Sequence, residues 1–215
     1  MGNKHPHKKP KPQKQSRHLE TYVTSINNKI DIGFLGEESA GKTSVIHSIL
    51  NLEFNEDMVL TIGVEKMEKR YEINQDASKR RSRGVLRDFP EFSESKRLIF
   101  WDTPGQVRFR HSCMKAMKNF HGIMIVFDLT KKNTFENLNN WMKEIKNKLT
   151  HNPVLVLLGN KADYNKESWE VNDEEIKKFT EKNNLAYFEV SAKTKKGIDD
   201  ALKYIVDKII QKYED

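Results

Sequence analysis

The segment from Gly36 to Thr43 has the residue types and spacing of a phosphate-binding loop. It reads Gly-Glu-Glu-Ser-Ala-Gly-Lys-Thr, a G-x-x-x-x-G-K-T match between an apolar run and a helical pattern. Its glycines let backbone N–H groups turn toward an anion, and the start of the helix adds its dipole. Lys42 would reach the β- and γ-phosphates, and the Thr43 hydroxyl would ligate Mg²⁺. The pattern predicts that a nucleoside triphosphate contacts Glu38, Ser39, Ala40, Gly41, Lys42, Thr43 and Ser44.

Two acidic residues of this loop, Glu37 and Glu38, are unexpected beside phosphates. Like charges repel at short range, so a carboxylate facing the phosphates would oppose binding. The sequence leaves two alternatives: the side chains point outward, or they lower nucleotide affinity.

A second motif, Asp102-Thr103-Pro104-Gly105-Gln106, directly follows the apolar run Leu98–Trp101. A carboxylate at the carboxyl end of a strand, beside a phosphate loop, can hold Mg²⁺ through water. Gly105 can offer a backbone N–H to a γ-phosphate, and Gln106 can orient an attacking water. The motif therefore predicts Asp102 at a metal and Gln106 in hydrolysis.

Two further segments favour guanine as the base: Asn160-Lys161-Ala162-Asp163, and Ser191-Ala192-Lys193 after the last apolar run. The Asp163 carboxylate can accept hydrogen bonds from the guanine N1–H and N2–H₂ groups, which adenine lacks. The Ala192 N–H could donate to the guanine O6. A wrong base would leave buried polar groups unpaired. The ligand is therefore expected to be GTP or GDP with Mg²⁺, held on the base side by Asn160, Lys161, Asp163, Ser191, Ala192 and Lys193.

Short apolar runs at wide spacing must position these motifs. They are rich in β-branched and aromatic residues and too short for typical helices, which predicts buried strands at Ile30–Leu35, Leu98–Trp101, Ile123–Phe127, Val154–Leu158 and Tyr187–Val190, and a half-exposed one over Val64–Ile73. Helical patterns lie between them at 44–52, 135–149 and 198–209. Strands alternating with helices predict an α/β domain over 26–213, with a mostly parallel sheet covered on both faces.

The positive charge of the chain is concentrated in two segments. The 215 residues carry a net charge of +7, and residues 1–18 alone hold six basic residues and no acid. Residues 1–25 are expected to be a disordered basic extension, because so polar a segment cannot bury enough surface to order itself. A basic loop insertion is expected at about 74–94, around the run Lys79–Arg87. Neither run has interleaved aromatic residues, so nucleic acid is not the favoured partner.

Cysteine content and hydropathy limit the cellular setting. The single cysteine, Cys113, excludes an intrachain disulfide and is in keeping with a reducing compartment. No stretch approaches the ~18–20 apolar residues of a membrane-spanning helix. The chain is expected to be cytoplasmic, with peripheral contact to the cytosolic face of an endomembrane through its basic N-terminus.

The four motifs, in this order, resemble the Ras superfamily of small GTPases, and their local text most resembles the Rab branch. The similarity runs from about Lys29 to Gln211. Thr61–Glu65 is similar to the Rab switch I segment, and Trp101–Arg110 resembles the switch II text W-D-T-A-G-Q-E-R-F-R. Gly122–Thr130 and Glu189–Thr194 resemble the Rab segments that end in Y-D-x-T and E-T-S-A-K-T.

The resemblance implies a fold, an activity and several residue roles. It implies the P-loop GTPase fold, with a six-stranded, mostly parallel sheet, one antiparallel edge strand and helices on both faces. It implies a monomeric switch in vesicle traffic that hydrolyses GTP slowly and meets an exchange factor, an activating protein and effectors. Thr61 would ligate Mg²⁺ and contact the γ-phosphate, and Phe54 would stack on guanine. Hydrolysis would rest on Gln106, Lys42 and Thr61, and Mg²⁺ on Thr43, Thr61 and Asp102.

Several positions depart from the family pattern. Glu38 stands where many members carry glycine, and its bulk would obstruct an activating arginine. Pro104 replaces alanine and restricts switch II, because proline fixes φ. Lys66 and Ala116 replace two aromatic residues that join Trp101 in an effector-facing cluster. The alternative reading is therefore a GTP-dependent binding module with negligible hydrolysis.

Lipid attachment is open in the sequence. Met1-Gly2 would permit myristoylation, although Pro6 stands where that pattern has Ser or Thr. The last residues, Tyr213-Glu214-Asp215, hold no cysteine for prenylation. Either a native tail was removed, or the protein reaches membranes by another route.

Overall fold

Six strands form one sheet in the computed structural model, which describes residues 28–73 and 94–214. Their order across the sheet is β2-β3-β1-β4-β5-β6. Only β2 runs antiparallel to its neighbour, and the other pairs are parallel. The expected mostly parallel sheet with one antiparallel edge strand is confirmed. The strands are β1 Lys29–Leu35, β2 Glu65–Ile73, β3 Glu94–Asp102, β4 Gly122–Asp128, β5 Val154–Asn160 and β6 Ala186–Glu189.

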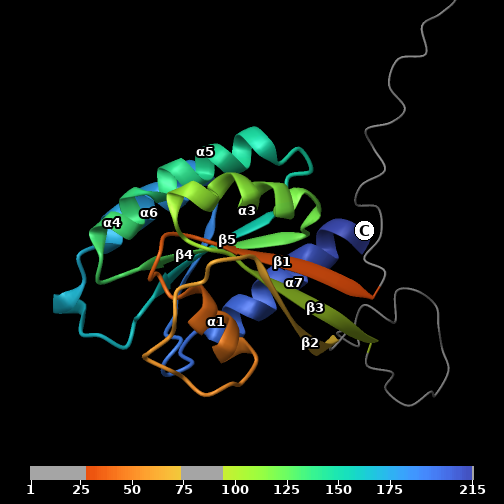
Figure 1. The fold of residues 1–215 in the computed structure, drawn as a ribbon, viewed down its shortest axis with the longest axis horizontal. Coiled ribbons are helices and arrows are strands. Elements are labelled where there is room, and N and C mark those ends of the chain that lie inside the picture. The colour runs from red at the N-terminus through yellow and green to blue at the C-terminus, as the bar shows by residue number, and fades with distance from the viewer. Residues whose placement is uncertain (1–27, 74–93, 215) are drawn as a thin grey trace, which may run out of the picture.

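Helices cover both faces of the sheet (Figure 1). One layer consists of α1 Lys42–Ile49 and α7 Ile198–Glu214, and the other of α3 Arg110–Ala116, α4 Lys132–Glu136, α5 Leu138–Lys148 and α6 Asp173–Asn183. Side chains alternate between the faces of a strand. Ile30, Ile32 and Phe34 of β1 accordingly pack in the cluster that includes α1 and α7, whereas Leu35 packs in the cluster of the second layer. No helix in the described ranges has both the length and the apolar character to cross a bilayer.

The main differences from the sequence predictions concern the helices and the insertion. The helix expected over 135–149 is two helices that meet at Asn137, whose ψ of −10° departs from the helical value. Helix α1 begins at Lys42 rather than Ser44 and ends at Ile49. Helices α3 and α6 were not predicted. Glu94 already belongs to β3, so the expected insertion is one residue shorter there; residues 74–93 and 1–27 lie outside the described residues.

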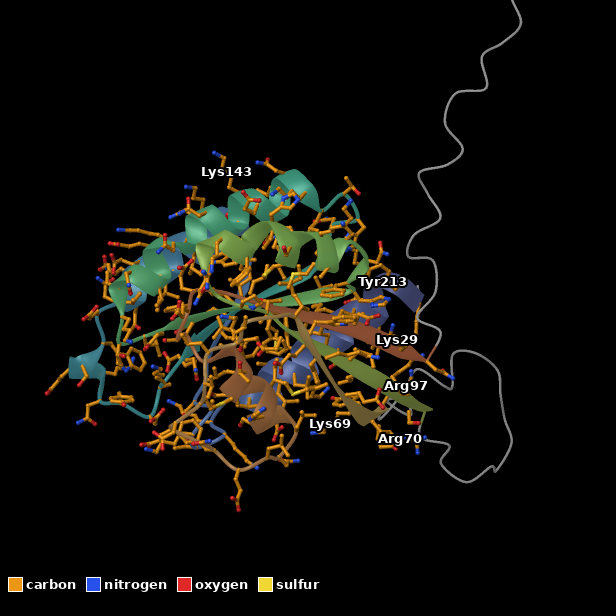
Figure 2. The ribbon with its side chains drawn as sticks, in the orientation of Figure 1. Lys29, Lys69, Arg70, Arg97, Lys143 and Tyr213 are labelled. Carbon is orange, nitrogen blue, oxygen red and sulfur yellow. The ribbon has the colours of Figure 1, made fainter. Side chains whose placement is uncertain are left out.

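The two ends of the sheet have different surroundings. The phosphate loop follows the carboxyl end of β1, on the side where β3, β4 and β5 also end, and ligand sites in such folds lie at that edge. At the opposite end Lys29, Arg97 and Arg70 are neighbours in the register of β1, β3 and β2. Figure 2 shows these three side chains grouped there. Both basic segments of the sequence join the described chain at this end, before Asn28 and between Ile73 and Glu94.

Candidate functional site

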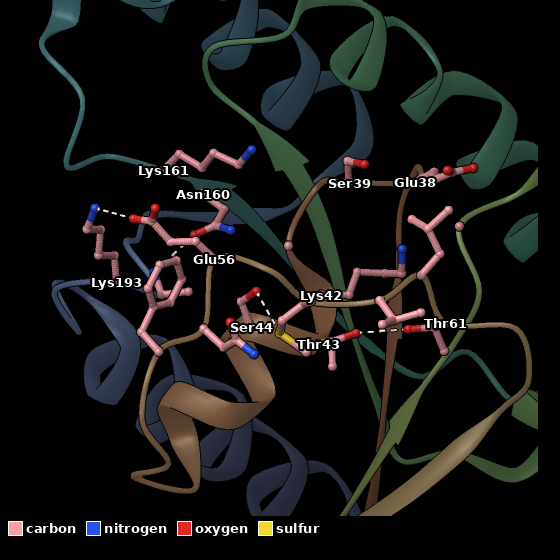
Figure 3. Close-up of a pocket in the computed structure, with 18 of the residues that line it drawn as sticks. Glu38, Ser39, Lys42, Thr43, Ser44, Glu56, Thr61, Asn160, Lys161 and Lys193 are labelled. Atoms are coloured by element: carbon pink, nitrogen blue, oxygen red, sulfur yellow. Dashed lines mark hydrogen bonds and ion pairs between the residues drawn. The ribbon is translucent and has the colours of Figure 1, made fainter.

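A pocket of about 380 Å³ opens at the carboxyl edge of the sheet (Figure 3). Ligand pockets in proteins typically have volumes of about 300–1,000 Å³, so it can hold a small ligand. Of the residues predicted to bind the nucleotide, all but two line this pocket. The two exceptions, Ala40 and Ser191, are buried behind its wall. The predicted residues that line the pocket are Glu38, Ser39, Gly41, Lys42, Thr43, Ser44, Phe54, Thr61, Gly105, Asn160, Lys161, Asp163, Ala192 and Lys193.

The phosphate loop closes around its own lysine. Gly41 has φ +88°, and a Cβ there would meet the Asn160 side-chain nitrogen at 2.3 Å, so the position requires glycine. The Lys42 ammonium donates to the carbonyls of Gly36 and Glu37 at 3.1 and 2.9 Å. Burial lowers the pKa of Lys42, and the nearby Asp102 carboxylate opposes that shift. The backbone carbonyls of the loop therefore hold the Lys42 ammonium in place, and a positive charge at this position suits an anion site.

Three oxygen-bearing side chains converge at the start of α1. Thr43 Oγ1 lies 2.5 Å from Asp102 Oδ2 and 3.0 Å from Thr61 Oγ1, and Thr61 Oγ1 donates to the same carboxylate oxygen at 3.1 Å. They come from α1, β3 and the segment before β2, and Asp102 is fully buried. Hydroxyl and carboxylate oxygens suit a hard cation such as Mg²⁺. The structure thus brings together the three predicted metal ligands.

A single amide joins the phosphate side of the pocket to the base side. Asn160 Nδ2 donates to the Ala40 carbonyl at 3.0 Å, and Asn160 Oδ1 accepts from the Ala192 N–H at 3.1 Å. The Ala192 N–H, predicted as a donor to guanine, therefore donates to Asn160 in this structure. The buried Ser191 hydroxyl donates to Asp163 Oδ1 at 2.6 Å and so orients that carboxylate. Ala40 and Ser191 support the pocket without lining it.

Comparison with known proteins identifies the family of this chain. A model of the Ras family matches residues 31–211. The chain belongs to the Ras family. It is 32% identical over 185 residues to Ras-related protein Rab-27B of Homo sapiens, which covers 84% of this chain and 79% of that protein. It is 32% identical over 183 residues to Ras-related protein Rab-18-B of Danio rerio, with 85% and 80% covered. This protein is therefore a Rab-like small GTPase.

The segment before Thr61 supplies pocket residues that were not predicted from the sequence. Glu56 binds Lys193 at 2.7 Å, an ion pair that lowers the pKa of Glu56 and raises that of Lys193. The Lys193 ammonium also lies 5.9 Å from the centre of the Phe54 ring. The missed lining residues are Asn55, Glu56, Met58, Val59, Leu60 and Tyr164. Sequence position could have indicated them: five lie between the predicted residues Phe54 and Thr61, and Tyr164 directly follows the predicted Asp163.

Switch II of this Rab-like GTPase lies directly against the phosphate loop. A Cβ at Gly105 would meet the Glu38 backbone nitrogen at 2.3 Å, so only glycine permits this approach. The Gln106 side chain lines the pocket, but its Oε1 accepts a hydrogen bond from Arg108 Nε at 2.9 Å. The Gln106 oxygen that would contact a water molecule therefore already accepts one hydrogen bond, from Arg108.

The two acidic residues of the phosphate loop have different environments. Glu37 Oε1 accepts a hydrogen bond from the indole N–H of Trp141 in α5 at 2.8 Å. Glu38 is exposed and lines the pocket. The sequence left two alternatives for these residues. The Glu37 side chain points away from the pocket, toward α5, whereas Glu38 lies at the pocket itself.

Trp101, the remaining aromatic residue of the expected effector-facing cluster, has partners inside the domain. Its indole N–H donates to Asp31 Oδ1 at 2.9 Å, and its ring stacks on Phe120 at 5.1 Å between centroids. Lys66 lies opposite it in the β2–β3 register and is exposed. This face therefore presents a cation beside a half-buried indole.

Proposed function

We propose that this Rab-like protein binds GTP and GDP with Mg²⁺ and acts as a molecular switch in vesicle traffic. The observation that carries the nucleotide part is one pocket lined by Thr43, Thr61 and Asp163, with the buried Asp102 carboxylate hydrogen-bonded to the two threonine hydroxyls. The traffic part is supported by the similarity to Rab proteins.

Each side of the pocket has a task in this proposal. Thr43, Thr61 and Asp102 would hold Mg²⁺, which supplies positive charge against the phosphates when it is bound. Lys42 adds a second positive charge from inside the loop, because its ammonium is held by backbone carbonyls. Phe54 and Lys193 would cover the faces of the base, and Asp163 would read its edge.

Base selectivity tests the nucleotide part. Asp163→Asn should lower GTP affinity and raise affinity for xanthosine triphosphate, because an amide matches the xanthine carbonyl better than the guanine amine. Fluorescent GTP displaced by unlabelled GTP, ATP and xanthosine triphosphate would measure this. Equal affinity of the parent protein for ATP and GTP would contradict the proposal.

Hydrolysis is proposed to be slow without a partner. Positioning and charge stabilisation provide most of the rate in such reactions, and an arginine supplied by a partner is worth on the order of 10³–10⁵. The Arg108–Gln106 hydrogen bond favours the second candidate function, a GTP-dependent binding module with negligible hydrolysis. Single-turnover hydrolysis by the parent and by Gln106→Leu separates the two. Equal rates would remove Gln106 from the chemistry.

The partners belong to the same proposal. An exchange factor, an activating protein and effectors would meet the switch segments of a monomer, as in the Rab family. The basic N-terminus would add peripheral contact to the cytosolic face of an endomembrane, because each basic residue near an anionic surface contributes about 1 kcal/mol.

A further inference from the structure

Trp141 connects a helix of the domain to the phosphate loop. It is fully buried in α5, among the apolar residues between the sheet and the second helix layer. Its indole N–H donates to Glu37 Oε1 at 2.8 Å, although the two residues are 104 positions apart in the chain. Packing fixes the ring, so the position of its N–H group is fixed as well.

Glu37 lies at a point where a free carboxylate would interfere with phosphate binding. Its backbone carbonyl accepts from the Lys42 ammonium, and its carboxylate is close enough to raise the pKa of Lys42. Its backbone also lies beneath Gly105 of switch II. A carboxylate turned toward the pocket would compete with phosphates for Lys42 and repel them.

We propose that Trp141 is a positioning residue that holds the Glu37 carboxylate on the α5 side of the phosphate loop and so keeps its negative charge away from the phosphates. The inference rests on the proposed nucleotide binding. Because the γ-phosphate adds negative charge, the effect is larger for GTP than for GDP. Trp141 thereby contributes to the preference between the two nucleotides without touching either.

A double-mutant cycle separates this role from packing. Trp141→Phe keeps most of the apolar ring and removes the N–H donor, so GTP affinity should fall about 10-fold, the lower range for a hydrogen bond to a charged group, and GDP affinity less. In a Glu37→Gln background the same substitution should change either affinity less than about two-fold, because no charge is left to release. The readout is the dissociation constant of each fluorescent nucleotide.

Trp101→Phe is the matched control. It removes the same kind of bond, an indole N–H donating to the Asp31 carboxylate at 2.9 Å, from a carboxylate that is not in the phosphate loop. It should leave the ratio of GTP to GDP affinity as in the parent protein. An equal loss for Trp141→Phe in both backgrounds, or no loss in the parent, would overturn the proposal.

A readout without nucleotide keeps the inference separate from the proposed function and from the folding of the variants. The indole N–H resonance of Trp141 should differ between the parent protein and Glu37→Gln, because the substitution replaces a charged carboxylate acceptor by a neutral amide. A resonance that is the same in the parent and in Glu37→Gln would refute the hydrogen bond. If the resonance differs between the parent and Glu37→Gln but the parent binds no guanine nucleotide, the proposed function fails while the contact stands.

Discussion

At the scale of single residues, Asn160 connects two loops of the pocket, because its side-chain amide bonds to the phosphate loop and to the loop after β6. Asn160→Ala should speed the dissociation of GDP about 10-fold, since two hydrogen bonds of about 0.5–1.5 kcal/mol each are lost. Release of fluorescent GDP measures this. Asn139→Ala, which removes an exposed hydrogen bond from Asn139 of α5 to the Glu136 carbonyl of α4, is the control. Equal release rates in the two variants would contradict the role of Asn160.

Glu38 allows a second test at this scale. It is exposed at the rim of the pocket, where an arginine from an activating protein would approach. Glu38→Gly should raise partner-stimulated hydrolysis more than intrinsic hydrolysis, because it removes bulk from that approach. Phosphate release with and without an activating protein measures both rates. An unchanged or lower stimulated rate would count against the steric argument.

The sequence predicted the identities of the site residues better than their contacts. Lys42, Asp102 and Asp163 are located by short local patterns, each fixed by a few neighbouring residues, and the structure places Lys42 and Asp163 in the pocket wall and Asp102 within hydrogen-bond reach of Thr43 and Thr61. The bonds from Asn160 to Ala40 and from Trp141 to Glu37 join residues 120 and 104 positions apart. No local pattern specifies such pairs, because they depend on how the layers pack.

At the scale of elements, Gly197 makes the turn from β6 into α7. Its φ is +68°, and a Cβ there would meet the Glu189 carbonyl oxygen at 2.3 Å. Gly197→Ala should therefore lower the free energy of unfolding by at least about 1–2 kcal/mol, the cost of left-handed backbone in other residues. Urea unfolding measures the loss. Gly63→Ala, with no atom within 4 Å of the added Cβ, should unfold like the parent.

The strands were easier to predict than the helices. Buried strands of a parallel sheet are near-continuous apolar runs, which stand out in the sequence. Helix α6 is mostly polar, so apolar periodicity did not predict it. The capping box formed by Asn172 and Glu175 was the sequence signal that could have located its start. The division at Asn137 needed the structure, because Phe135 and Leu138 keep the helical spacing across it.

At the scale of the whole molecule, acid should destabilise the fold near neutral pH. His121 accepts the Asp31 N–H at Nδ1, and burial lowers the pKa of His121 and of His151. The unfolded chain then binds protons more readily than the folded one, so this stability is complete above about pH 6.5 and is lost as the pH falls through the folded pKa. The urea midpoint should fall between pH 7 and 5.

His121→Gln should reduce that fall, because its amide oxygen can still accept the Asp31 N–H but does not titrate. His111→Gln, at an exposed histidine of α3, should keep the acid sensitivity of the parent. Urea unfolding midpoints of the parent and of both variants, measured at pH 7 and at pH 5, test this. Identical acid sensitivity in the parent and in His121→Gln would contradict the assignment.

Membrane contact is a prediction for the whole chain. Deletion of residues 1–18, which carry six basic residues, should weaken sedimentation with vesicles that contain phosphatidylserine. The parent should bind those vesicles less at high salt and bind neutral vesicles little, because the attraction is screened. Equal binding by the parent and the shortened chain would refute the N-terminal contact.

The position of Lys29, Arg70 and Arg97 has a consequence for how the molecule would sit on such a surface. Lys29 begins β1, with Arg97 of β3 and Arg70 of β2 beside it, and the phosphate loop follows the end of β1, seven residues after Lys29. At about 3.3 Å per residue the two are about 20 Å apart. The Debye length in physiological salt is about 8 Å, so charges at one end are screened from the other. An anionic bilayer would orient the protein with its nucleotide pocket facing the aqueous phase, and attachment would leave phosphate affinity unchanged.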